Sequence, residues 1–120
     1  MIEGTWKSNN VKINQLNYET GELRQDLFNL ELHILSKVNN QYICRLVFHN
    51  NIKKNESGHE FLFLNFNEKK KELSGIDSNS YLTGYLENNK LHFISTGFEH
   101  IKFAKKKFMT SYNTIFEKKN

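Results

Sequence analysis

The sequence predicts an all-β protein, an up-and-down antiparallel meander closed into a small barrel of eight to ten strands. Within the apolar runs, hydrophobic and polar residues alternate with the period of two that is typical of half-buried strands. No stretch combines a helix cap with an apolar stripe of 3.6-residue period, so no helix is expected. Turn-forming clusters recur about every 10 to 20 residues between the runs, as expected for a meander. These clusters are Asn9-Asn10, Thr20-Gly21, Asn39-Asn40, Asp77-Ser78-Asn79 and Asn88-Asn89.

The first half of the chain supplies the clearest strand pattern. In 28–34 and again in 42–48 every second residue is apolar, and Asn39-Asn40 between them predicts a hairpin. Upstream, the apolar phase changes within 11–18, which predicts a β-bulge near Gln15. A strand that bends there can pair with two neighbours and close the barrel.

The segment 50–58 is polar and lacks periodicity, so we expect it to be the longest loop. The strand expected after it, His59 to Asn67, carries apolar residues on both faces. Phe61 and Phe63 lie opposite the inward set, and two interpretations remain open. Either the long loop or a second protein covers these rings, or they are exposed, as scattered apolar side chains often are.

The remaining strands follow at similar spacing. The charged run 68–72 is predicted to be a solvated hairpin tip. The strands expected after it are Leu73 to Ile76, Tyr81 to Glu87, Lys90 to Ser95, Glu99 to Ala104 and Lys107 to Phe116.

Length and composition predict one domain, spanning 1–120, with an aromatic-rich core. A chain of 120 residues can bury roughly two-thirds of its surface, which suffices for one modest core. Only 38% of residues are hydrophobic, but ten Phe, five Tyr and one Trp concentrate apolar area in large rings. The single Cys44 cannot form an internal disulfide, and we expect an inert thiol in the core.

The hydropathy and the charge of the chain limit the kinds of partner that we expect, namely a membrane or a nucleic acid. No apolar run approaches the roughly 20 residues of a membrane-spanning helix, and no leader opens the chain. We therefore expect a cytoplasmic protein without membrane contact, or a mature fragment of an exported protein. The net charge is +4, but fifteen of the seventeen cations are Lys, whereas nucleic-acid readers more often use Arg. The composition therefore argues against a nucleic-acid partner. Such a partner would use Lys69 to Lys71 and Lys105 to Lys107.

Gly4-Thr5-Trp6 at the start of the first strand resembles the Gly-x-Trp signature of lipocalin-like, or calycin, barrels. The resemblance implies that Gly4 and Trp6 form a plug at one end of the barrel. It also implies that a basic side chain from the end of the chain stacks on the indole, here Lys118 or one of 105–107. Gly-Thr-Trp is also similar to the opening of fatty-acid-binding proteins, and Leu82-Thr83-Gly84-Tyr85 is similar to avidin-type barrels.

Hydroxyl groups and aromatic rings are predicted to share the barrel interior. A hollow interior of this kind would bind a small apolar or amphipathic ligand. If the interior is filled, we expect the protein to act as a protein-interaction or inhibitor module through 50–58 and the Phe61/Phe63 face. The same face could join two copies in a homodimer. The residues predicted to line the interior are Phe28, Tyr42, Phe48, Thr83, Tyr85, Phe93, Phe108, Thr110 and Tyr112.

No signature of catalysis or nucleotide binding is present, so we expect neither an enzyme nor a cofactor. His33 and His49 lie on the outward face of neighbouring strands, where two imidazoles can bind a metal ion. Without a carboxylate or thiol beside them we expect surface histidines and no metal site.

Overall fold

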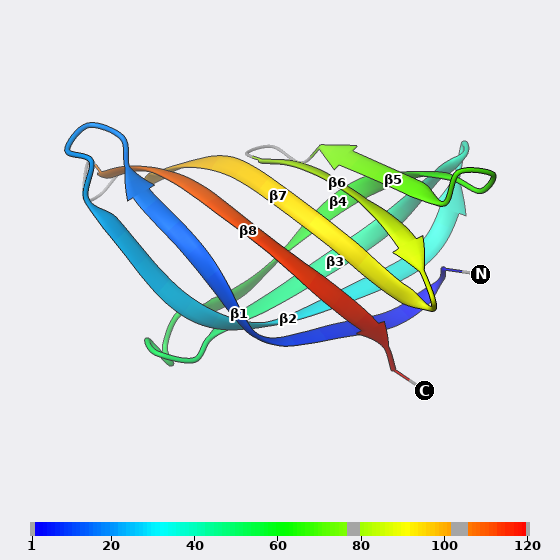
Figure 1. Ribbon diagram of the computed structural model, residues 1–120, viewed down its shortest axis with the longest axis horizontal. Coiled ribbons are helices and arrows are strands. Elements are labelled where there is room, and N and C mark those ends of the chain that lie inside the picture. Colours follow the sequence, from blue (N-terminus) through cyan, green and yellow to red (C-terminus); the bar gives the residue numbers. More distant parts are fainter. Residues whose placement is uncertain (1, 77–79, 102–105, 120) are drawn as a thin grey trace.

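The computed structural model describes residues 2–76, 80–101 and 106–119, with side chains except at 98–101 and 106–107. Eight antiparallel strands run through these ranges, each paired with the next, and β8 pairs back with β1 to close a barrel (Figure 1). The described part contains no helix, and hence none that could cross a membrane. The predicted all-β meander is confirmed. The strands are β1 (Gly4–Asn17), β2 (Leu23–Val38), β3 (Gln41–Asn50), β4 (Ser57–Asn67), β5 (Glu72–Ile76), β6 (Ser80–Glu87), β7 (Lys90–Ile101) and β8 (Lys106–Lys118).

Pairs of asparagines make two of the tightest turns. Asn39 and Asn40 join β2 to β3 with φ values of 51° and 65°, and Asn88 and Asn89 join β6 to β7 with 52° and 59°. Positive φ at both central residues is the geometry whose twist matches paired strands, and asparagine tolerates it better than most residues. Both predicted hairpins are confirmed, whereas the turn predicted at 77–79 lies outside the described residues.

The predicted break at Asn9-Asn10 and the predicted bulge near Gln15 were both wrong, because β1 continues through 9–10 and its bulge lies there. Ser8 pairs with Leu30 and Val11 pairs with Phe28, so β1 holds one extra residue at 9–10 and does not turn there. Asn10, with φ of 54°, supplies the bulge conformation. The extra residue shifts the inward face of β1 from even to odd positions, so Trp6 and Val11 are both buried. The change of apolar positions within 11–18 marks no second bulge, because Leu16 keeps regular register on the face opposite Val11 and Ile13. Gln15 itself sits in regular register.

The strand predicted at 99–104 is not separate. Residues 99–101 continue β7, which pairs with β8 without interruption from Lys90 to Ile101. Residues 102–105 lie outside the described part.

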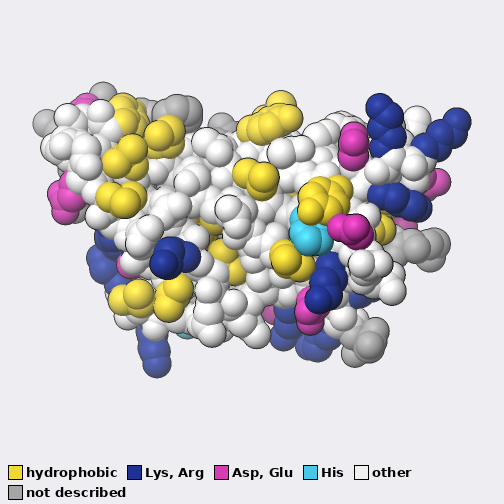
Figure 2. Space-filling view, viewed as in Figure 1, with side chains coloured by type: hydrophobic (Ala, Val, Ile, Leu, Met, Phe, Trp, Pro, Cys, Tyr) yellow, Lys and Arg dark blue, Asp and Glu magenta, His cyan; other side chains and the backbone are white. Residues whose placement is uncertain are grey.

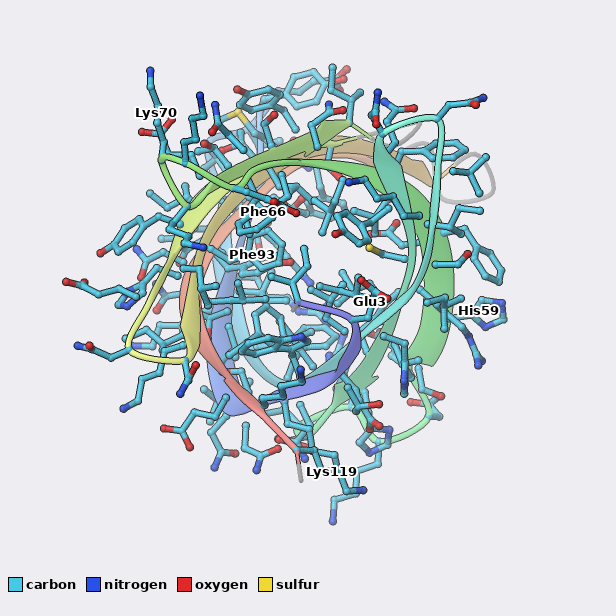
Figure 3. All side chains as sticks on the ribbon, turned by 90° about the vertical axis from the view of Figure 1, so that its right-hand side faces the viewer. Glu3, His59, Phe66, Lys70, Phe93 and Lys119 are labelled. Atoms are coloured by element: carbon cyan, nitrogen blue, oxygen red, sulfur yellow. The ribbon has the colours of Figure 1, made fainter. Side chains whose placement is uncertain are left out.

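The barrel is solid at the end where the two chain termini lie. Figure 3 looks into this end, and Phe66 and Phe93 project inward whereas His59, Lys70 and Lys119 project outward. Phe93 packs edge-on against Phe116, with ring centroids 5.3 Å apart. The inward faces predicted for 28–34 and 42–46 are confirmed as buried. The apolar residues with the least exposed side chains are Ile2, Trp6, Leu32, Ile34, Cys44, Leu64, Leu91 and Phe116.

Trp6 plugs this end of the barrel. Its side chain is 2% exposed, and its Nε1 donates a hydrogen bond to the Ile2 carbonyl at 2.8 Å. Lys118, the register partner of Trp6 on β8, places Nζ 5.6 Å from the indole centroid, which confirms the expected cation–π contact. Gly4 has φ of 130°, and a Cβ there would lie 3.0 Å from Lys118 Cε. Glycine is therefore required where the lysine stem crosses the first strand.

Cys44 is fully buried on the inward face of β3, as predicted. Burial raises the pKa of its thiol to about 12, because the thiolate would lose its hydration. The thiol is thus a core group with little thiolate character at neutral pH.

We predict that Trp6→Ala lowers the free energy of unfolding by about 3 to 5 kcal/mol, because it removes a buried ring from a packed end. Lys118→Ala should cost about 0.5 to 1 kcal/mol, the range of an exposed cation–π contact. Urea unfolding followed by circular dichroism measures both. Lys119→Ala is the matched control and should leave the midpoint unchanged. A loss below about 1 kcal/mol for Trp6→Ala would contradict the plug.

Candidate functional site

The half of the barrel away from Trp6 is hollow. A cavity of about 340 Å³ lies between the inward faces of β1, β2, β3, β4, β6, β7 and β8. Glu56 comes from the loop between β3 and β4, and the other lining residues come from the parts of their strands that lie toward the β1–β2 and β3–β4 turns, at the left of Figure 1. The interior is therefore neither wholly filled nor wholly open, and the predicted alternatives describe different halves of the same barrel.

One wall of the cavity is apolar. Phe28 and Phe48, from neighbouring strands, meet edge to face with ring centroids 6.3 Å apart. Gly58, the register partner of Phe48 on β4, makes room for this ring, since a Cβ there would lie 3.0 Å from Phe48 Cζ. A glycine on β4 thus shapes the aromatic wall. The apolar lining consists of Ile13, Phe28, Leu30, Leu46 and Phe48.

The rest of the cavity lining is polar. It offers hydroxyl, amide and carboxylate groups, and no Lys, Arg or His of the described part belongs to the lining. Apolar walls with a few convergent polar groups are the usual composition of small-molecule sites. The polar lining consists of Gln15, Glu56, Ser57, Glu60, Ser80, Ser95, Thr110 and Tyr112.

The structure brings four of the predicted interior residues together around the cavity, namely Phe28, Phe48, Thr110 and Tyr112. Three others lie elsewhere on the inward faces. Tyr42 and Phe93 are 5% and 3% exposed and belong to the packed core, and Phe108 is partly buried but does not line the cavity.

The expected inward orientation of Thr83 and Tyr85 was wrong. In β6 the buried Leu82 and the partly buried Leu86 face the core, so the odd positions between them face outward. Tyr85 is 45% exposed and stacks on His92 with ring centroids 4.4 Å apart and planes at 7°. The phase of a short strand is set by its leucines, because tyrosine can keep its ring at the surface and its hydroxyl in water.

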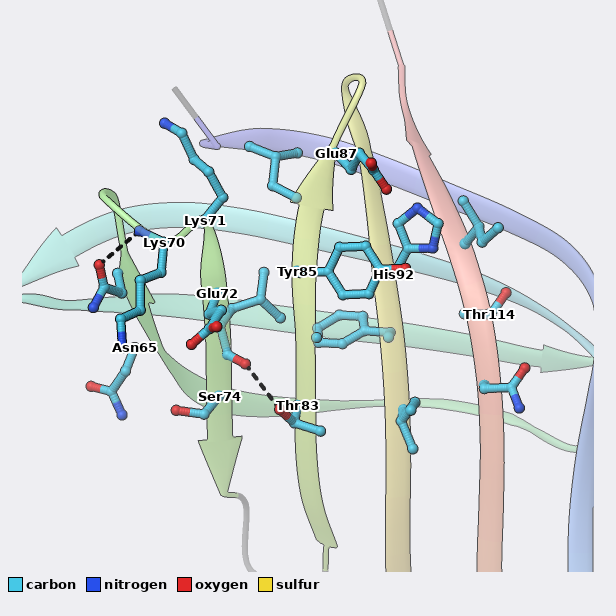
Figure 4. A pocket seen from close by; sticks show the side chains of 18 residues that line it. Asn65, Lys70, Lys71, Glu72, Ser74, Thr83, Tyr85, Glu87, His92 and Thr114 are labelled. Carbon is cyan, nitrogen blue, oxygen red and sulfur yellow. Dashed lines mark hydrogen bonds between the residues drawn. The ribbon is translucent and has the colours of Figure 1, made fainter.

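Thr83 and Tyr85 instead line a groove of about 1090 Å³ on the outer face of β4 to β8 (Figure 4). In Figure 2 hydrophobic side chains and a histidine gather over these strands at the right of the visible face. Charges of both signs, among them Lys71 and Glu72, border the stacked rings. The groove lies on the outer surface of the sheet and is more open than the interior cavity, so the interior cavity is the better candidate site.

A buried polar network at the mouth of the cavity was not foreseen. Asn50 is fully buried, and its Nδ2 donates to Asp26 Oδ2 at 2.9 Å and to Glu56 Oε2 at 3.1 Å. Its Oδ1 accepts the backbone N–H groups of Ile52 and Lys53, both at 2.9 Å. Asn50 thus satisfies every polar atom of its side chain and fixes the loop at 51–56, which is shorter than the predicted 50–58.

Arg24 completes this network. Its Nε and one terminal nitrogen donate to Asp26 Oδ2, and the same terminal nitrogen lies 3.5 Å from Glu56 Oε2. Hydrogen bonding to Arg24 lowers the pKa of Asp26, with a further contribution from Asn50, against the opposing effect of burial. One sequence signal did exist, because Arg24 and Asp26 continue the even-numbered inward face of Phe28 and Leu30.

His33 and His49 lie apart on their two strands. His33 lies 3.1 Å from the Thr5 hydroxyl and 3.4 Å from Glu31, whereas His49 is exposed opposite Asn29, four positions along β2 from His33. In the described part of the chain, no group of three or more His, Cys, Asp or Glu residues could hold a metal ion.

Nothing outside the chain points to a ligand. No protein-family model matches this sequence, and no curated protein or solved structure matches it. The shape and lining of the cavity are therefore what identify the site.

We predict that Asp26→Asn reduces the amount by which the free energy of unfolding falls in acid. The pKa of Asp26 is lowered by folding, so its carboxylate stabilises the fold above the unfolded value, about 3.9, and this is lost as pH falls through the folded pKa. Urea unfolding at about pH 7 and pH 3 should show a smaller difference for the variant than for the unmodified protein. Glu22→Gln, in an exposed turn, is the control. Equal acid losses in all three proteins would contradict the network.

Proposed function

We propose that the protein is a non-enzymatic, lipocalin-like binding barrel that holds a small apolar or amphipathic molecule in its hollow half. The observation that carries the proposal is the cavity itself, which is lined by the rings of Phe28 and Phe48 together with hydrogen-bonding groups. The eight-stranded closed barrel supports the lipocalin-like resemblance. So does the Gly4-Thr5-Trp6 plug beneath Lys118.

The size of the cavity favours one small ligand. About 340 Å³ is near the lower end of the volumes typical of small-molecule sites, roughly 300 to 1,000 Å³. The Asn50 network holds the neighbouring loop in place without a ligand, so little chain ordering is needed on binding. Preorganisation of this kind raises affinity by reducing the entropy lost on association.

A protein-interaction function is the second candidate, favoured by an apolar band on the outer face. Phe63, Ile76 and Tyr81 are successive register partners across β4, β5 and β6, and they are 50%, 69% and 53% exposed. Phe61, two residues from Phe63 on the same face, is 60% exposed. Contiguous apolar surface of this kind is typical of sites that a partner or a second copy covers.

We predict saturable binding of N-phenyl-1-naphthylamine, a neutral dye that fluoresces in apolar surroundings. Thr110→Phe places a ring in the cavity and should weaken dye binding by about tenfold or more, since little space remains. Thr83→Phe makes the same change on the outer face and should bind as the unmodified protein does. Absence of saturable binding, or equal weakening by both substitutions, would count against the interior site.

For the second candidate we predict that the protein self-associates at micromolar concentration and that Phe61→Ser, which removes the most exposed of these phenylalanines, reduces the association. Sedimentation velocity over a concentration series measures this. Ile115→Ser, at an exposed isoleucine of β8, is the control. A monomer at every concentration, unaltered by Phe61→Ser, would remove a homodimer from consideration.

A further inference from the structure

We propose that the groove on the outer face of β4 to β8 binds a neutral oligosaccharide whose sugar rings stack on the exposed ring of Tyr85. This site is separate from the interior cavity and goes beyond the proposed function. An open groove suits an extended chain, which lies along a surface and needs no enclosure. Extended polymers bind to open strand faces of other small barrels.

Two rows of outward side chains line the groove, and each row crosses all five strands. Register pairing places Tyr85 beside His92 in one row and Thr83 beside Ile94 in the other (Figure 4). Neighbouring strands lie about 4.8 Å apart, so each row is roughly 19 Å long and can follow several sugar units in succession. The first row consists of Asn67, Glu72, Tyr85, His92 and Ile115, and the second of Asn65, Ser74, Thr83, Ile94 and Asn113.

Tyr85 supplies a surface on which a sugar ring can stack. Its side chain is 45% exposed, although it also stacks on His92 with ring centroids 4.4 Å apart. A pyranose ring presents C–H groups on its flat faces, and these hydrogens are attracted to the negative face of an aromatic ring. The contact with His92 orients the Tyr85 ring before a ligand arrives, so little side-chain entropy is lost on binding.

The amide and hydroxyl groups of the groove match the hydroxyl groups of a sugar, since both kinds of partner donate and accept hydrogen bonds. Asn65 Oδ1 accepts a bond from Gln41 Nε2 at 3.2 Å. Asn67 Oδ1 accepts the backbone N–H groups of Lys69 and Lys70, both at 3.1 Å. These bonds involve the amide oxygens and not the nitrogens, so both side chains are oriented and can donate to a ligand.

The charges that line the groove balance, which favours a neutral ligand over a polyanion. Among the described lining residues, Lys70 and Lys71 stand against Glu72 and Glu87. The net charge of +4 on the chain, counted with neutral histidine, therefore comes from other residues. A nucleic-acid backbone would meet as many carboxylates as ammonium groups here, whereas sites for nucleic acid carry an excess of positive charge.

Isothermal titration calorimetry with cellohexaose, a neutral and extended chain of glucose units, tests the proposal. We predict saturable binding. Cellobiose, which is made of two glucose units, should bind at least about tenfold more weakly, because it covers only part of the two rows. Raising NaCl from about 50 mM to about 500 mM should change the affinity for cellohexaose by less than about twofold, because a neutral ligand releases no counterions.

Tyr85→Ala should weaken cellohexaose binding by about tenfold or more, because it removes the ring on which the sugar stacks. Tyr85→Phe keeps the ring and should stay within about threefold of the unmodified protein. Tyr18→Ala is the matched control, because it removes a tyrosine of similar exposure, 42%, from the turn between β1 and β2. Circular dichroism checks that each variant is folded.

The outcomes separate this site from the interior cavity. Thr110→Phe, which alters the cavity, should bind cellohexaose as the unmodified protein does. No binding of cellohexaose at millimolar concentration, or equal binding by Tyr85→Ala, would overturn the groove assignment and leave the proposed function standing. Binding of a short oligothymidylate that is tighter than that of cellohexaose and falls with salt would overturn it in favour of single-stranded nucleic acid. Absence of dye binding alone would overturn the proposed function and leave the groove assignment standing.

Discussion

The burial of Trp6 beneath Lys118 is the interaction on which the rest of this barrel depends. The indole and the rings of Phe93 and Phe116 fill one end, so that only the opposite end can be hollow. The same contact joins the two ends of the chain, because Trp6 on β1 is the register partner of Lys118 on β8. The same contact therefore packs the plug, closes the sheet and leaves the cavity at the opposite end.

The bulge in β1 allows this one strand to supply side chains both to the plug and to the cavity. β1 pairs with β8 at Trp6 and Lys7 and again along 14–17, with a register shift between the two stretches. The extra residue at 9–10 turns Trp6 inward at the solid end and Ile13 and Gln15 inward at the hollow end. Without it, one of these two sets would face solvent, since a shift of one residue exchanges the faces of a strand.

Sequence patterns predicted what depends on neighbours along the chain. Alternation gave the inward faces of β2 and β3, paired asparagines gave two hairpins, and Gly4-Thr5-Trp6 gave the plug. Features that depend on pairing between distant strands were missed. Asn9-Asn10 has the composition of a turn, and only its pairing with β2 shows a bulge. The Asn50 network depends on a contact between Asn50 and Asp26, which lie 24 positions apart, and the outward phase of Tyr85 follows from packing of the leucines around it.

The central claim is that the barrel is solid around Trp6 and hollow beside Phe28 and Phe48. A crystal of the protein under xenon pressure tests it most directly, because xenon enters apolar cavities and scatters strongly. We predict a xenon site against the rings of Phe28 and Phe48, and none in the core between Trp6 and Phe116. A barrel collapsed onto these phenylalanines without xenon, or a xenon site beside Trp6, would contradict the account.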